Sequence, residues 1–157
     1  MCDYSLCGLP TRLAVEGEVL AVHRFRTGSM GLASPAEVKL AERTPPHRRR
    51  GFWNYLKSLF AENSMPPSVT AVCVPPGTQM VLKNIPEDQR RRWKVGEEEL
   101  VSFVQLSANA YSYRDAVRFS SGQEVLLQNL REGIAAEVIC VGDMTPEFAN
   151  RPVVPVL

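Results

Sequence analysis

Short runs of β-forming residues, each ended by a glycine or proline turn, recur along this chain and restrict its fold more than any other feature. Examples are EVLAVHRF at 18–25, LVSFVQL at 100–106 and DAVRF at 115–119. Short strands at this spacing are typical of all-β architectures. The pattern therefore predicts a mainly β fold, a small barrel or sandwich of six to seven short strands.

The turns between these runs predict two sets of pairings. Pro76-Gly77 suits a type II turn, so residues 69–74 and 79–85 are expected to form one hairpin. A second hairpin should join 115–119 to 123–128 through Gly122, whose backbone would take a positive φ. Residues 134–141 should then return beside 123–130. The core residues expected from this arrangement are Val117, Val125, Leu127, Ala136 and Val138.

The size of the chain is that of one domain. It has 157 residues and 17.5 kDa, with 45% hydrophobic and 22% charged residues. This balance excludes a disordered chain or a disulfide miniprotein, and the net charge of +1 excludes a polycation that coats nucleic acid. We expect a single β-rich domain over 1–144 and an extended tail over 145–157, which carries several prolines.

Residues 39–68 differ in character from the rest and predict a basic, proline-rich insertion that carries one amphipathic helix. The helix would span 51–62, about 11 residues, which is too short to be stable without packing against something. Its apolar face and the preceding basic run are candidate partner-binding residues: Arg48, Arg49, Arg50, Phe52, Trp53, Leu56 and Phe60. The alternative is that this face packs on its own β domain. Shorter helical turns are expected after Pro35 and within 85–99.

The N-terminus has no basic start followed by an apolar stretch, so it does not predict a signal peptide. No window approaches the roughly 18 apolar residues of a membrane-spanning helix. We therefore expect a cytoplasmic protein without a transmembrane segment. In a reducing compartment its four cysteines should be thiols or metal ligands rather than disulfides.

Three cysteines and one histidine form a candidate metal site. Cys2 and Cys7 have the spacing C-x4-C, and His23 and Cys73 occupy like positions on two expected strands. Together they could supply four ligands to zinc or another transition metal. The alternative is that these cysteines are ordinary core and surface thiols. Cys140, between Ile139 and Val141, is expected in the core.

Two further functions remain possible. Removal of Met1 would leave the Cys2 thiol beside a free amine, as in an enzyme with an N-terminal nucleophile. His23 and His47 are the only histidines, so acid–base partners for such an enzyme are few. Alternatively, Arg90 to Arg92 precede Trp93, and basic residues beside an aromatic ring can hold RNA. The balanced net charge makes nucleic acid the less favoured ligand.

Parts of the sequence resemble a group of small bacterial proteins of unassigned function. The resemblance lies in MCDYSL at 1–6, CVPPGT at 73–78 and DAVRFSSGQEVLLQNLREG at 115–133, and it omits 39–68. It implies a bacterial, cytoplasmic protein with a similar β-hairpin near its end, and it transfers no activity.

These observations together predict a non-enzymatic accessory or binding protein. Its β domain could hold a structural metal, and its 51–62 helix would dock on a partner protein or on a second copy of the chain. No catalytic residue is assigned. The alternatives are a cysteine-dependent enzyme that uses Cys2 and a small RNA-binding β-barrel.

Overall fold

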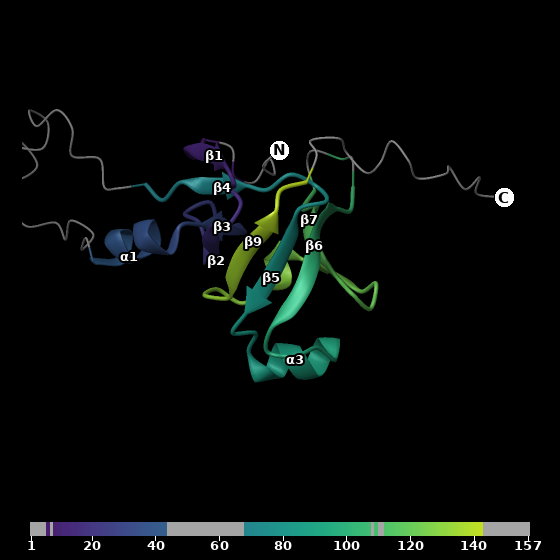
Figure 1. Ribbon diagram of the computed structural model, residues 1–157. Helices are drawn as coiled ribbons and strands as arrows, with labels where there is room; N and C mark the ends of the chain where they lie inside the picture. The colour runs from purple at the N-terminus through teal and green to yellow at the C-terminus, as the bar shows by residue number, and fades with distance from the viewer. Residues whose placement is uncertain (1–5, 7, 44–67, 108, 110–111, 143–157) are drawn as a thin grey trace, which may run out of the picture.

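The computed structural model describes residues 6, 8–43, 68–107, 109 and 112–142. This part of the chain is mainly β, as expected, with nine strands and two α-helices (Figure 1). The strands are β1 (Thr11–Leu13), β2 (Val19–Arg24), β3 (Met30–Ala33), β4 (Ala71–Cys73), β5 (Gln79–Lys83), β6 (Glu99–Gln105), β7 (Asp115–Phe119), β8 (Glu124–Leu126) and β9 (Ala135–Cys140). The helices are α1 (Pro35–Arg43) and α3 (Glu87–Trp93), and η2 (Leu127–Asn129) is a short 3-10 turn.

All nine strands belong to one open sheet, in the order β1-β4-β3-β2-β9-β5-β6-β7-β8. The expectation of a closed barrel or sandwich with six to seven strands was therefore wrong. The sequence pattern missed β3, because Gly28 before the strand and Gly31 within it suggested a turn. All pairs are antiparallel except β1 with β4, which is parallel.

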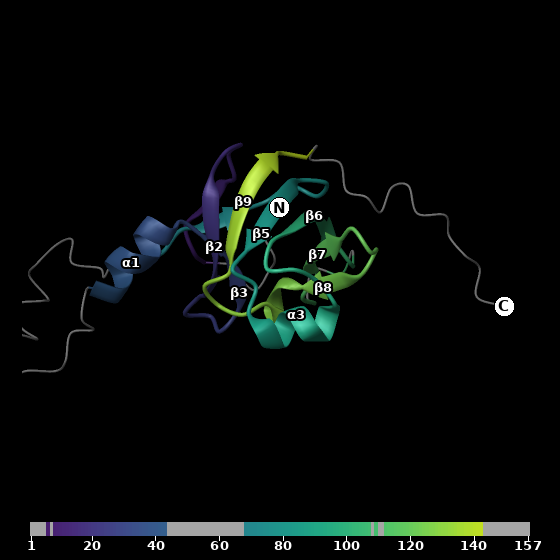
Figure 2. The ribbon, with the colours of Figure 1, turned by 60° about the horizontal axis from the view of Figure 1, so that its bottom comes forward.

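The sheet curls so that its far end returns towards β3. Figure 2 shows β2, β9, β5, β6 and β7 following one another around the interior. The side chain of Gln128 in η2 bridges the gap, because its Oε1 accepts from the Met30 backbone N–H at 3.0 Å and its Nε2 donates to the Met30 carbonyl at 3.0 Å. These two bonds replace the backbone ladder that would close a true barrel.

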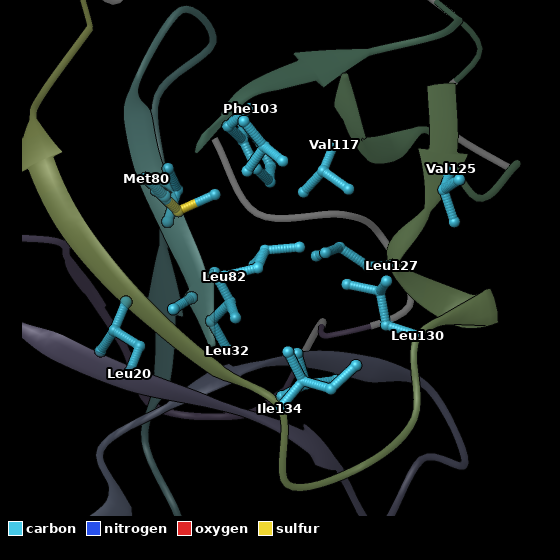
Figure 3. Close-up of a cluster of buried hydrophobic side chains, with 14 of the residues drawn as sticks. Leu20, Leu32, Met80, Leu82, Phe103, Val117, Val125, Leu127, Leu130 and Ile134 are labelled. Carbon is cyan, nitrogen blue, oxygen red and sulfur yellow. The ribbon is translucent and has the colours of Figure 1, made fainter. Parts of the chain in front are cut away.

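The inside of the curl holds the main hydrophobic core. Side chains from opposite parts of the sheet meet there, among them Leu20, Met80, Phe103, Val117 and Ile134 (Figure 3). Trp93 of α3 is also buried in this cluster, at one end of the curled sheet. The expected core residues all lie in it: Val117, Val125, Leu127, Ala136 and Val138.

The outer face of β2, β3 and β4 carries a second, smaller cluster. Successive strand residues point to opposite faces, so Leu20 and Val22 face the main core while Ala21 and His23 face outward. The outer cluster consists of Leu6, Phe25, Ala33 and Ala71, with Leu9, Val38 and Val69 packed against it. Helix α1, which supplies Val38, lies on this side of the molecule (Figure 1).

The predicted hairpin at 115–128 is confirmed, but the predicted return of residues 134–141 beside it is wrong. β7 and β8 pair antiparallel, and Gly122 in their turn has φ of 84°. β9 does not return beside β8 but pairs with β2 and β5. The chain instead forms η2 after β8, and the turn at Gly133 then sends β9 to the middle of the sheet.

The turn at 75–78 also forms without the hairpin that it predicted. Gly77 has φ of 84°, and Thr78 N–H donates to the Pro75 carbonyl at 3.3 Å. However, β4 pairs with β3 and β1, whereas β5 pairs with β9 and β6. The turn therefore passes the chain from one part of the sheet to another.

The two described helices fall where short helical turns were expected, after Pro35 and within 85–99. None of the helices in this part of the chain is long and apolar enough to cross a membrane. The predicted helix at 51–62 and the tail at 145–157 lie outside the described residues.

Candidate functional site

The predicted site residues divide into those that the structure describes and those that it does not. Cys2 and Cys7 lie outside the described residues. So do the predicted partner-binding residues Arg48, Arg49, Arg50, Phe52, Trp53, Leu56 and Phe60. His23 on β2 and Cys73 at the end of β4 are described and can be located relative to each other.

Cys73 is disulfide-bonded in this structure, to a partner outside the described residues. The expectation that the cysteines are thiols is therefore wrong for Cys73. A metal binds the thiolate form of cysteine, so Cys73 cannot serve as a zinc ligand while the disulfide is intact.

His23 and Cys73 share the outer face of the sheet, as their strand positions predicted, but β3 separates them. His23 pairs with Gly31 of β3, and the register of β3 with β4 places Cys73 on the other side of Gly31. Their backbones are thus two strand spacings apart, about 9.5 Å. A Cβ atom on Gly31 would lie 3.0 Å from Phe25 Cε2 and 3.2 Å from Leu6 Cδ1. Apolar side chains therefore occupy the space over Gly31.

The contact that His23 does make is with a carboxylate from a distant turn. Its Nδ1 is buried and lies 2.8 Å from Oε1 of Glu132, although the ring N–H is not aimed along a hydrogen bond to that oxygen. The same oxygen accepts from the Arg24 backbone N–H at 3.0 Å. The Gly133 N–H donates to the Val22 carbonyl at 2.8 Å, which fixes the turn against β2. The ring of His23 is thus held in place, and its Nε2 makes no hydrogen bond within the described part of the chain.

A groove of about 350 Å³ lies beside His23 on the outer face. This volume is at the small end of the range for ligand sites. β2, α1 and the segment that leads into β4 contribute its apolar walls, together with a residue near the N-terminus: Leu9, Phe25, Val38, Ala41 and Val69. Most of these residues belong to the outer cluster, so the groove is the part of that cluster that remains open.

The polar residues that line the groove carry both signs of charge. They are His23, Arg24, Arg26, Glu42 and Ser68. Phe25 lies edge-on to the His23 ring, with their centroids 5.1 Å apart and an interplanar angle of 77°. The side chain of Arg24 is engaged, since its Nη1 donates to the Gly28 carbonyl at 3.1 Å. Arg26 and Glu42 form no ion pair within the described residues.

The basic residues of α3 are arranged differently. A shallow hollow of about 310 Å³ is lined by Glu87, Arg90, Arg91 and Val95. Arg91 pairs with Glu87, and Arg90 Nη1 lies 3.9 Å from Glu97 Oε2. Trp93 is buried with its ring centroid 6.0 Å from that of Phe119, so it cannot stack on an RNA base as considered above. The charges around this hollow are largely compensated from within the chain.

Cys140 is an exposed free thiol rather than a core residue. The last two residues of β9, Ile139 and Cys140, are exposed. The apolar neighbours of Cys140 therefore do not indicate a core position. Across the described residues, no three His, Cys, Asp or Glu side chains are grouped closely enough to hold a metal ion.

Sequence reasoning found His23 but missed Glu132, Arg26 and Glu42. Glu132 reaches His23 only through the pairing of β2 with β9, for which the sequence carries no local signal. Arg26 and Glu42 are exposed charges of ordinary appearance. Only the folded arrangement places them along one groove.

Comparisons with models of protein families, with curated proteins and with solved structures find no match to this chain.

Proposed function

We propose that this chain is a non-enzymatic binding protein whose outer-face groove receives a segment of a partner protein. The observation that carries the proposal is the groove itself. It combines apolar walls, a fixed histidine with an unengaged Nε2, and two charged side chains without ion-pair partners in the described part of the chain. Such a mixture of apolar walls and a few placed polar groups is typical of recognition sites.

The partner-binding segment predicted from the sequence is connected to this groove at both ends. The chain leaves the described part after Arg43 and re-enters it at Ser68, and the groove is lined by Glu42 on one side of this gap and by Ser68 on the other. We therefore propose that the 51–62 segment and the basic run at 48–50 act on the same partner as the groove. The curled sheet serves as the rigid support.

The metal site is a separate proposal. Zinc could bind only after reduction of the disulfide at Cys73, because the metal needs a thiolate. Elemental analysis of the protein purified with and without a reductant tests this. Zinc present in stoichiometric amount only in the reduced sample would support the site.

Selection of peptides from a random displayed library tests the binding function. The selected peptides should bind the intact chain and lose affinity when Ala41→Trp fills the groove. Ala36→Trp is the matched control, because Ala36 is exposed on the same helix and does not line the groove. Deletion of residues 45–66 should leave the β domain folded and weaken binding. Equal affinity for Ala41→Trp and Ala36→Trp would rule out the groove as the binding surface.

A further inference from the structure

Two oppositely charged side chains line the groove and form no ion pair with each other. Arg26 lies in the turn after β2 and Glu42 in the last turn of α1, so they line the groove from two different elements. Both residues are exposed, and neither forms an ion pair within the part of the chain that the structure describes. Some surface charges elsewhere are paired, including Arg12 with Glu18, Lys83 with Glu137 and Arg118 with Glu124, whereas others, such as Arg92 and Glu98, also form no ion pair within the described residues.

The position of Glu42 is not explained by the stability of its helix. The C-terminal end of a helix carries a partial negative charge, so a carboxylate in the last turn is unfavourable there and a cation is favoured. The negative charge of Glu42 and the partial negative charge at the end of α1 therefore both favour a positively charged group in the groove beside them.

The Arg26 side of the groove has the opposite preference. His23 Nδ1 lies 2.8 Å from Oε1 of Glu132, and its Nε2 makes no hydrogen bond within the described part of the chain. Arg26 follows Phe25 directly, and Phe25 packs edge-on against the His23 ring. An acidic group near this side would meet the guanidinium of Arg26, with His23 as a neighbouring polar group.

We infer that the groove selects a peptide segment with a bulky apolar side chain flanked by an acidic residue on one side and a basic residue on the other. This inference rests on the proposed function and names the chemistry of its partner. The apolar side chain would fill the space between Phe25, Val38 and Val69. The acidic residue lies towards Arg26 and the basic residue towards Glu42, so the order of the two charges along the peptide decides its affinity.

Capped hexapeptides with a central phenylalanine test the inference. One peptide carries aspartate before and lysine after the phenylalanine, a second has the reverse order, and a third has serine at both places. Affinities are measured by isothermal titration calorimetry on the intact chain. We expect one order to bind about threefold to tenfold more tightly than the other, the range that one or two exposed ion pairs produce.

A charge-reversed protein gives the decisive measurement. In the double variant Arg26→Glu, Glu42→Arg the preferred order should invert. The control double variant Arg92→Glu, Glu98→Arg changes exposed charges away from the groove and should keep the order preferred by the original chain. A circular dichroism melt confirms that both variants are folded.

The outcomes separate this inference from the proposed function. If the serine peptide binds and neither charge order is preferred, the charge selection is overturned and the binding function stands. A preference that does not invert in the double variant also overturns the roles of Arg26 and Glu42. If none of the three peptides binds, this inference is overturned, and the comparison of Ala41→Trp with Ala36→Trp decides the proposed function separately.

Discussion

The same strands form both faces of the sheet, but the two faces differ in how their side chains pack. The inner face packs large apolar side chains from almost every strand into one core, and residues such as Leu20, Met80 and Val138 are completely buried there. The smaller cluster on the outer face of β2, β3 and β4 has four buried members, of which two are alanines. The groove borders this smaller cluster, and Phe25, Val38 and Val69 belong to both.

We therefore assign stability to the inner face of the sheet and recognition to the outer face. The inner core buries enough apolar area to hold the fold. The outer cluster has far fewer buried residues, and the groove beside it is lined by His23, Arg26 and Glu42. Changes on the inner face should therefore alter unfolding, and changes on the outer face should alter the groove with a small effect on unfolding.

The largest effect is expected from a truncation in the inner core. Phe103 on β6 is 2% exposed and belongs to the cluster drawn in Figure 3. Phe103→Ala removes its contacts and leaves a cavity, so the free energy of unfolding should fall by about 3–5 kcal/mol. Urea denaturation followed by circular dichroism measures the change.

The matched control lies on the outer face of the same strand. Leu100 is 53% exposed, so Leu100→Ala should change the free energy of unfolding by no more than about 0.5 kcal/mol. A loss of similar size in both variants would show that the two faces of β6 do not differ as the structure indicates.

The second effect concerns the bridge that replaces barrel closure. Gln128→Ala removes both bonds to the Met30 backbone and leaves a part-buried N–H and carbonyl without these partners. We expect a loss of about 1–3 kcal/mol of unfolding free energy. Hydrogen exchange measured by NMR should show faster exchange at the Met30 amide.

An exposed glutamine provides the control for this variant. Gln123 lies in the turn between β7 and β8, and its side chain forms no hydrogen bond within the described residues. Gln123→Ala should leave the exchange at Met30 unchanged. If Gln128→Ala also leaves it unchanged, the open sheet does not depend on this bridge.

The strands of the sheet could be predicted from sequence far better than their partners. Runs of β-forming residues ended by turns predicted β2, β6 and β7, and in β2 buried and more exposed residues also alternate. β3 has all four residues buried, so it shows no alternation, and its Gly31 resembles a turn residue. Gly31 lies under the side chains of Phe25 and Leu6, which leave little space for a Cβ atom.

Pairing was mispredicted wherever it joined segments distant in the chain. Turn chemistry at Gly77 and Gly122 was predicted correctly because it depends on a few adjacent residues. The pairing of β9 with β2 joins residues more than 110 positions apart, for which the local sequence gives no signal. The same pairing brings Glu132 to His23, so the candidate site was predictable only in part.

The third prediction concerns Gly31, which lies under the outer cluster. In Gly31→Ala the added Cβ would lie 3.0 Å from Phe25 Cε2, so the ring must shift. The expected loss is about 1 kcal/mol of unfolding free energy, at the low end for overpacking. The NMR shifts of the His23 ring should also change, because Phe25 packs against it. Unchanged His23 shifts would mean that this ring pair tolerates the extra methyl group.

The smallest expected effect concerns an ion pair near the edge of the outer face. Arg12 donates side-chain hydrogen bonds to Glu18, and these bonds hold the pKa of the Glu18 carboxyl below its ordinary range. A carboxyl whose pKa is lower in the folded state stabilises the fold above its unfolded pKa, about 4.3, and this contribution is lost as the pH falls through the folded pKa. Glu18→Gln removes it, so the variant should be less stable than the original chain at neutral pH by a few tenths to about 1 kcal/mol.

The stability difference between the two proteins should narrow once the pH falls below the unfolded-state pKa of about 4.3, and it should vanish as the pH falls through the lower pKa of Glu18 in the folded chain. Urea midpoints measured between pH 3 and pH 7 follow this convergence. Glu124→Gln is a useful comparison, since Glu124 also pairs with an arginine, Arg118, but lies on β8 at the opposite edge of the sheet. A constant difference between Glu18→Gln and the original chain at every pH would show that Glu18 acts through its Val15 backbone contact or its packing rather than through its charge.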